Sequence, residues 1–129
     1  EWKEANFSPK QAVGWTKIEV SPAAASAWVK AGYESAKQAR DWVRGGLPPQ
    51  NAQDWEKAFP GDAAAAVQWF KAGFTEPDKA AKWAALVLFP WDAMRWIENG
   101  FDWDETNAFY ERGIKDTYQA ARERKRDAN

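Results

Sequence analysis

Large aromatic residues recur along this chain at regular steps of about 13–14 residues, and such self-similarity is typical of repeat architectures. These anchor residues are Trp2, Trp15, Trp28, Trp42, Trp55, Trp69, Trp83, Trp96 and Phe109. An alanine stands three positions before each anchor from Trp15 to Trp96, at Ala12, Ala25, Ala39, Ala52, Ala66, Ala80 and Ala93, and only the Phe109 repeat differs, with Thr106. Every second anchor from Trp15 onward is evenly spaced, at Trp15, Trp42, Trp69 and Trp96. This even spacing of alternate anchors indicates two helices in each layer.

Start and stop signals for a short helix surround each anchor. Ser8-Pro9 and Ser21-Pro22 combine a good N-cap with proline at the first helical position. Asp62, Thr75, Asp102 and Asp116 are the predicted caps of later helices. A glycine stands four positions after five of the anchors, at Gly32, Gly46, Gly73, Gly100 and Gly113, where a left-handed helix end is expected. The signals predict helices of about ten residues.

The residue after each of these glycines is large and apolar. In a Schellman helix ending, this residue contacts the side chain five positions earlier, which here is the anchor. The predicted pairs are Trp28 with Tyr33, Trp69 with Phe74, Trp96 with Phe101 and Phe109 with Ile114. The same residue precedes the next cap, so it also joins the start of the following helix.

Helices this short are unstable alone in water, and each one has an Ala–aromatic stripe that a neighbour must cover. The sequence therefore predicts an all-α fold of tandem short helices, about 13–14 residues per helix and about 27 per pair, stacked as a small α-solenoid. We expect one helical-repeat domain over residues 1–129, as a segment of a longer protein because it opens in mid-repeat. Residues 114–129, with the polar run from Arg122 to Arg126, are the expected C-terminal capping helix.

The chain contains neither cysteine nor histidine. The usual near-neutral general base, the thiolate nucleophile and the commonest metal ligand are therefore missing. No Gly-rich phosphate loop is present, and no apolar run approaches the roughly 20 residues that span a bilayer. These features predict a protein that is not an enzyme, has no cofactor or metal, and has no membrane span.

A basic ladder is the first candidate partner-binding feature. It consists of the cations two positions after five successive anchors, Lys17, Lys30, Arg44, Lys57 and Lys71. Such a ladder suits an acidic partner or a phosphate backbone. The alternative is that these cations only complement helix dipoles, at about 0.3–1 kcal/mol each. The change to Glu98 and Glu111 in later repeats is not explained by the dipole.

Two tryptophans outside the anchor column form the second candidate. Trp91 and Trp103 each lie in the first turn of a predicted helix, beside Asp92 and Asp104. An aromatic and acidic patch of this kind suits a basic or proline-rich peptide. The alternative is that both rings fill the core where the repeat becomes irregular.

These features favour a non-catalytic binding module or scaffold that recognises another protein or a peptide. One alternative is binding of single-stranded nucleic acid through the basic ladder. Against this alternative stand the net charge of −1 and the excess of acidic residues between positions 48 and 111. A second alternative is a structural or self-associating spacer. The sequence indicates neither an oligomeric state nor a compartment.

Overall fold

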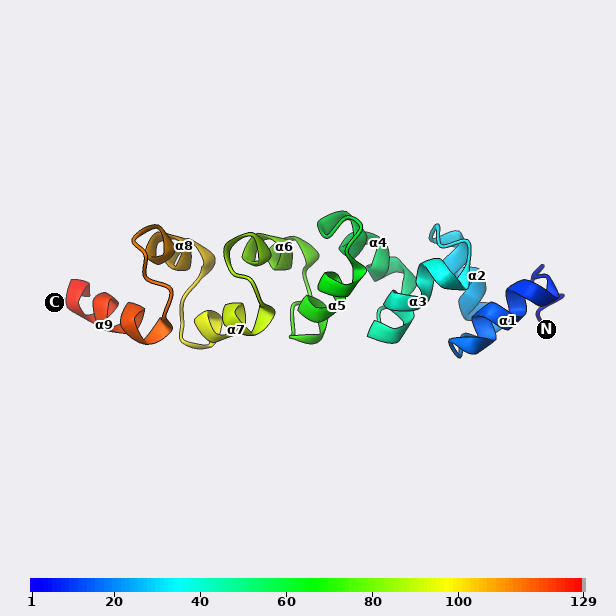
Figure 1. Cartoon of the computed structure of the whole chain (residues 1–129). Helices are drawn as coiled ribbons and strands as arrows, with labels where there is room; N and C mark the ends of the chain where they lie inside the picture. The colour runs from blue at the N-terminus through cyan, green and yellow to red at the C-terminus, as the bar shows by residue number, and fades with distance from the viewer. Residues whose placement is uncertain (129) are drawn as a thin grey trace. The chain divides into compact units, whose positions relative to one another are not determined.

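The computed structural model describes residues 1–128, and its helices follow the aromatic spacing (Figure 1). Within that range there are nine helices and no strand, which confirms the predicted fold class. The helices are α1 (Pro9–Lys17), α2 (Pro22–Lys30), α3 (Ala36–Gly45), α4 (Pro49–Ala58), α5 (Ala63–Lys71), α6 (Pro77–Leu86), α7 (Pro90–Glu98), α8 (Trp103–Glu111) and α9 (Thr117–Ala128). Asn129, the last residue of the predicted capping helix, lies outside the described residues.

The starts of the helices match most of the predicted caps. Ser8 and Gln11 form a reciprocal capping box, in which the Ser8 hydroxyl accepts from the Gln11 amide at 3.2 Å. The side chains of Ser21 and Asp62 accept from backbone amides in the same way. The prediction for Thr75 is wrong, because Pro77 occupies the first helical position and makes its neighbour Glu76 the cap residue.

The predicted helix endings are also present. The amide of Tyr33 donates to the carbonyl of Trp28 at 2.9 Å, and Gly32 between them has a φ of 104°. The rings of Trp28 and Tyr33 lie 5.1 Å apart, edge to face, and Trp96 and Phe101 repeat this separation. One aromatic residue therefore covers the end of a helix and fixes the direction in which the chain leaves it.

The core consists of the anchors and the small residues beside them. The anchors from Trp15 to Phe109 are all buried, with at most 8% of the surface exposed. The small residues from Ala25 to Thr106 are fully buried, whereas Ala12 near the first helix start is only half-buried. A methyl group beside an indole lets neighbouring helices approach closely and interlock.

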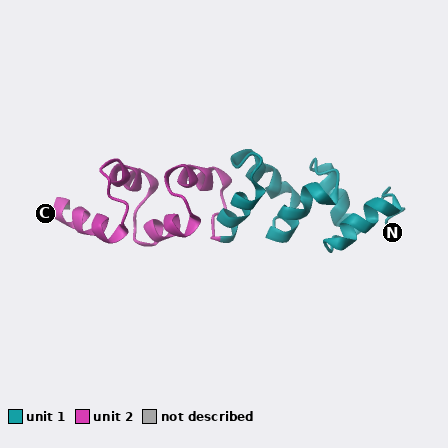
Figure 2. Ribbon diagram, viewed as in Figure 1, with its two compact units in different colours: residues 1–71 teal, residues 72–129 magenta. Residues whose placement is uncertain are grey.

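The chain divides into two compact units, residues 1–71 (unit 1) and residues 72–129 (unit 2), which Figure 2 shows in different colours. Within unit 1, α3 contacts both α1 and α5, and these three helices lie on the side opposite α2 and α4 (Figure 1). Within unit 2, α6 contacts both α7 and α8. Each unit is thus a stack in which a helix packs against its neighbour and against the next helix but one. The expectation of one domain over residues 1–129 stays a prediction.

The last helix keeps the spacing of the repeat but changes its chemistry. Ala120 is fully buried, as the small residue of the repeat should be. One repeat step after Phe109, however, the anchor position holds Glu123. The Glu123 carboxylate lies 3.5 Å from Arg112 and 3.6 Å from Arg126, and 18% of its side chain is exposed. A charged group therefore replaces the aromatic ring in α9.

Candidate binding groove

A groove of about 640 Å³ lies on unit 2 along α6 and α8. Its apolar surface comes from Phe74, Trp83, Met94, Ile97, Phe101 and Trp103. Charged residues stand at its edges, with Glu76, Lys79 and Lys82 on the α6 side and Asp102 and Glu105 on the α8 side. A volume in this range is typical of sites that enclose a small ligand or a few side chains.

Trp103 is the first residue of α8, and its ring is held by the neighbouring wall of the groove. The indole N–H donates to the carbonyl of Lys82 at 2.9 Å. The Lys82 ammonium lies 4.4 Å from the centroid of the same ring, in a cation–π contact. The indole is half-buried and remains a part of the groove wall. Its position is therefore fixed although part of its surface faces solvent.

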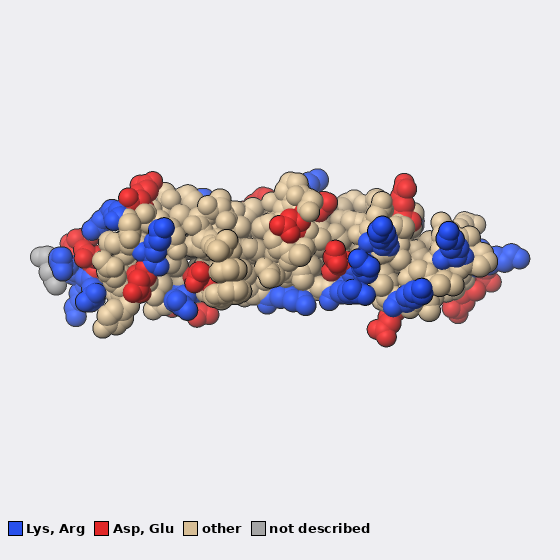
Figure 3. All heavy atoms as spheres, in the orientation of Figure 1, with Lys and Arg blue, Asp and Glu red and all other residues tan. Residues whose placement is uncertain are grey.

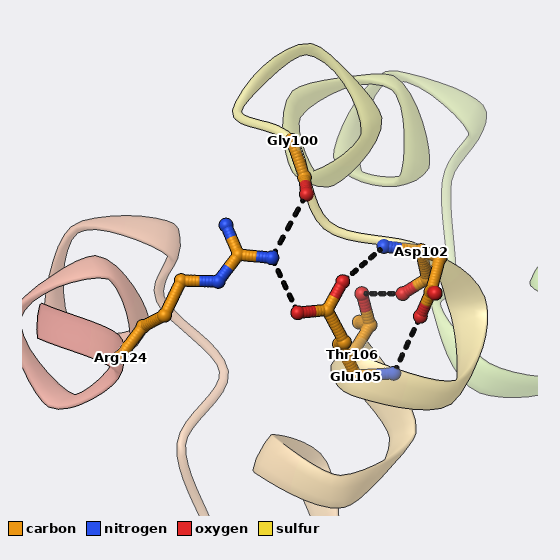
Figure 4. Close-up of polar contacts among 5 residues, drawn as sticks. All are labelled: Gly100, Asp102, Glu105, Thr106 and Arg124. Carbon is orange, nitrogen blue, oxygen red and sulfur yellow. Dashed lines mark hydrogen bonds and ion pairs between the residues drawn. The ribbon is translucent and has the colours of Figure 1, made fainter. Parts of the chain in front are cut away.

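The acidic edge of the groove is engaged by α9 (Figure 4). Asp102 and Glu105 form a capping box, in which the Asp102 carboxylate accepts from the Glu105 amide at 2.8 Å. Arg124 reaches from α9 to donate to the Gly100 carbonyl at 3.0 Å and to pair with Glu105. The Thr106 hydroxyl donates to the Asp102 carbonyl at 2.8 Å. We call this set of contacts the α9 clamp.

The α9 clamp favours the ionised form of Glu105. The hydrogen bond from Arg124 lowers the pKa of Glu105, and the backbone amide of Asp102 lowers it further. The guanidinium of Arg124 also lies 4.2 Å from the centroid of the Phe101 ring. Glu105 is thus ionised at neutral pH, and both of its carboxylate oxygens already accept hydrogen bonds.

The remaining charges of the groove are not balanced in the same way. Lys79 and Glu76 form an exposed ion pair at 2.8 Å. Lys82 contacts the Trp103 ring but has no carboxylate partner among residues 1–128. The groove therefore presents one cation without a counterion, beside an indole and two further apolar side chains, Met94 and Ile97.

The repeat places an equivalent groove on unit 1, also of about 640 Å³. Tyr33 and Trp42 there correspond to Phe74 and Trp83, which occupy the same places three helices later in the chain. The other side chains differ. Asp41, Gln53, Glu56 and Ala63 stand where the unit 2 groove has Lys82, Met94, Ile97 and Trp103. The two grooves thus share a backbone arrangement and differ in the chemistry of their walls.

No known protein family, curated protein or solved structure matches this chain. None of the helices in residues 1–128 is long and apolar enough to cross a membrane. The same residues contain no group of three or more acidic side chains that is arranged to hold a metal ion.

All five residues of the basic ladder are exposed and lie in the last turns of their helices. Lys17, Arg44 and Lys71 belong to α1, α3 and α5, whereas Lys30 and Lys57 belong to α2 and α4 on the other side of unit 1. None of them has an ion pair within the described residues. Figure 3 shows basic side chains standing out over unit 1 with acidic side chains among them. Their role in binding a partner stays a prediction.

The second candidate patch lies in two places rather than one. Trp91 is 55% exposed and stacks on Phe89, with the ring centroids 4.3 Å apart. It borders a different hollow, of about 370 Å³, and has no contact with Trp103 among the described residues. Asp92 is half-buried and Asp104 is exposed, and neither lines either hollow. Of the four predicted patch residues, only Trp103 belongs to the groove.

Lys82, Met94 and Ile97 are groove residues that the sequence interpretation missed. Each of them stands where the equivalent position of unit 1 has a residue of different polarity or charge. Comparing the repeats position by position, rather than searching for unusual aromatic residues, is the signal that would have found them.

Proposed function

We propose that this chain is a non-catalytic helical-repeat module that binds another protein or a peptide, and that the groove of unit 2 is its contact site. The observation that carries the proposal is Trp103, a partly exposed indole whose N–H is already bound to the Lys82 carbonyl. Unit 1 has Ala63 at the equivalent position, so the fold does not require a large ring there. Tryptophan is among the residues most enriched in the side chains that dominate binding energy.

The geometry of the groove suits recognition for a second reason. Because the Trp103 ring is held before any ligand arrives, little side-chain entropy is lost on binding. Met94 and Ile97 beside it provide adaptable apolar surface. A groove of this size accommodates a few side chains of a partner, so we expect dissociation constants of about 1–100 µM for a short peptide.

A display library of random linear peptides, selected on the whole chain, tests this proposal. We expect selected peptides to bind the wild-type chain and to lose at least about tenfold in affinity for Trp103→Ala. Trp91→Ala is the matched control, since that ring is more exposed and lies outside the groove. Far-UV circular dichroism checks that both variants remain helical. The proposal fails if no peptide is enriched, or if the enriched peptides bind Trp103→Ala as well as wild type.

Nucleic-acid binding through the basic ladder is the second candidate function. It is favoured by Lys17, Arg44 and Lys71, which carry no ion pair with any other described residue and lie on helices that contact each other in succession. A labelled single-stranded oligonucleotide, titrated at two salt concentrations, tests it. A surface that neutralises phosphates must bind more weakly at the higher salt, and reversing these three charges must weaken binding further. Absence of binding at low salt removes this candidate.

A further inference from the structure

We infer that the groove of unit 2 selects a peptide in which a large apolar side chain stands next to a carboxylate, rather than a basic or proline-rich peptide. This inference rests on the proposed function and names the chemistry of the ligand. Its basis is that the acidic and basic side chains around the groove differ in whether they already have partners. Every carboxylate at the edge already has a partner, whereas Lys82 has no counterion among the described residues.

The apolar half of the ligand is set by three apolar side chains. Trp103, Met94 and Ile97 all line the groove, and Ile97 is 38% exposed. Burying such surface against a leucine or aromatic side chain contributes about 25 cal/mol for each Å² removed from water. The groove therefore favours a ligand with one large apolar side chain.

The charged half of the ligand is set by Lys82. Its ammonium lies against the indole, and a lysine stem can stay packed on an aromatic surface while its head turns to a new partner. A ligand carboxylate within one or two positions of the apolar side chain would provide the counterion that Lys82 lacks within residues 1–128. Such a charge-assisted hydrogen bond is stronger than one between neutral groups, and solvent screens part of it at this exposed position.

A cationic ligand would find no unpaired carboxylate among the described residues of the groove and would lie close to Lys82. It would have to displace Lys82 from the indole face or approach this like charge. Glu105 is already bound by Arg124, Glu76 is paired with Lys79, and Asp102 caps α8. The groove of unit 1 reverses the pattern, because Asp41 and Glu56 stand at the positions of Lys82 and Ile97. The same scaffold thus places a cation at this position in unit 2 and an anion in unit 1.

Three labelled peptides of equal length test the inference by fluorescence anisotropy on the whole chain. Each has a central Leu-Phe pair, flanked by Glu in the first peptide, by Gln in the second and by Lys in the third. We expect the affinity to fall in the order Glu, Gln, Lys, with at least about tenfold between the first and the last. The advantage of the Glu peptide should shrink as salt is raised, because the contact with Lys82 is exposed.

Variants of the groove separate the charge from the apolar contact. Lys82→Gln should reduce binding of the Glu peptide to the level of the Gln peptide, and Lys82→Glu should reverse the order of the Glu and Lys peptides. Trp103→Ala should weaken all three. Lys37→Gln, at an exposed position of α3 that lines neither groove, is the matched control and should change nothing.

Three results would overturn the inference. The first is equal or tighter binding of the Lys peptide, and the second is an unchanged preference for Glu in Lys82→Gln. If the Gln peptide still binds in a way that depends on Trp103, the proposed function survives either of these. The third is the absence of binding by any peptide, here and in the display selection, which would remove the proposed function as well.

Discussion

At the scale of single residues, two residues other than glycine adopt a backbone conformation that glycine takes elsewhere in the repeat. Asn6 and Glu19 stand four positions after their anchors and have φ values of 69° and 61°. The glycines at the same position, Gly32 and Gly100, have φ values of 104° and 83°. A Cβ costs about 1–2 kcal/mol in this left-handed region, although asparagine tolerates it better than most residues. Glu19 is therefore the most strained ending of the array.

Replacing Glu19 with glycine should stabilise the protein. We expect Glu19→Gly to raise the free energy of unfolding by about 0.5–1 kcal/mol, because relief of the left-handed strain exceeds the entropy that glycine adds to the unfolded chain. The measurement is urea unfolding followed by circular dichroism. Ala27→Gly, in the middle of α2, is the control and should lower the free energy of unfolding by about 1 kcal/mol. An equal decrease in the free energy of unfolding for Glu19→Gly would show that the left-handed backbone at Glu19 is not strained.

Glu105 gives the protein a specific dependence on acid. Because the folded-state pKa of Glu105 is lowered, its ion pair with Arg124 stabilises the fold above the ordinary glutamate pKa of about 4.3 and is lost as pH falls below it. The pair is exposed over about two fifths of each side chain, so its contribution is below about 1 kcal/mol.

The comparison of wild type with Arg124→Gln tests this dependence. We expect the difference in free energy of unfolding between them to be largest near pH 7 and to shrink below about pH 4. It should not vanish, because the bond from Arg124 to the Gly100 carbonyl does not titrate. Lys125→Gln on the same helix is the control, with a difference that does not change with pH. A constant difference for Arg124→Gln down to about pH 3 would show that Glu105 contributes nothing.

At the scale of helices, a glycine sets how closely α3 and α5 approach. A Cβ built on Gly45 would lie 2.6 Å and 2.7 Å from the two methyl carbons of Val67. Both helices are in contact within unit 1, and a β-branched valine in a helix has little freedom to turn away. The close approach at this point therefore depends on the missing side chain.

Gly45→Ala should destabilise the protein although alanine is the better helix former. We expect a loss of about 1–3 kcal/mol, as for other insertions of a methyl group into a packed core. Gly14→Ala in α1 is the matched control, because its Cβ would lie 3.4 Å from Ala36, an ordinary contact. The free energy of unfolding of Gly14→Ala should rise by up to about 1 kcal/mol, because alanine has the higher helix propensity. Thermal or urea unfolding of Gly45→Ala and Gly14→Ala gives the two changes in the free energy of unfolding. An increase for both variants would show that α5 moves to make room for the methyl group on residue 45.

The spacing of the anchors was enough to place the helices, because each short helix is bounded by local signals and exposes one stripe. Side-chain partners across helices were harder to predict. Trp103 and Lys82 are distant in the chain and meet because α8 packs on α6, the next helix but one. Grouping Trp103 with Trp91 rested on nearness in the chain, whereas the fold alternates the side on which successive helices lie. The strained ending at Glu19 was also missed, since a glutamate gives no local sign of a left-handed backbone.

At the scale of the whole molecule, the repeat bears on the cooperativity of unfolding. No helix buries its own stripe, so each depends on its neighbours in the array. If residues 1–129 form one domain, as the sequence predicts, circular dichroism and tryptophan fluorescence should show a single urea transition with the same midpoint. Trp96→Ala should move that midpoint for both signals together. Two separate transitions, with only one moved by Trp96→Ala, would show that unit 1 and unit 2 unfold independently.

The step between anchors is not constant but differs by a single position from one repeat to another, and this has a consequence for insertions. An extra residue inside a helix would turn everything beyond it by about 100° and carry the next ring away from its place. Most helices here begin anew at a cap or proline of their own, so a residue added between two helices leaves the later rings where they were. The array should therefore tolerate lengthened connections and reject lengthened helices.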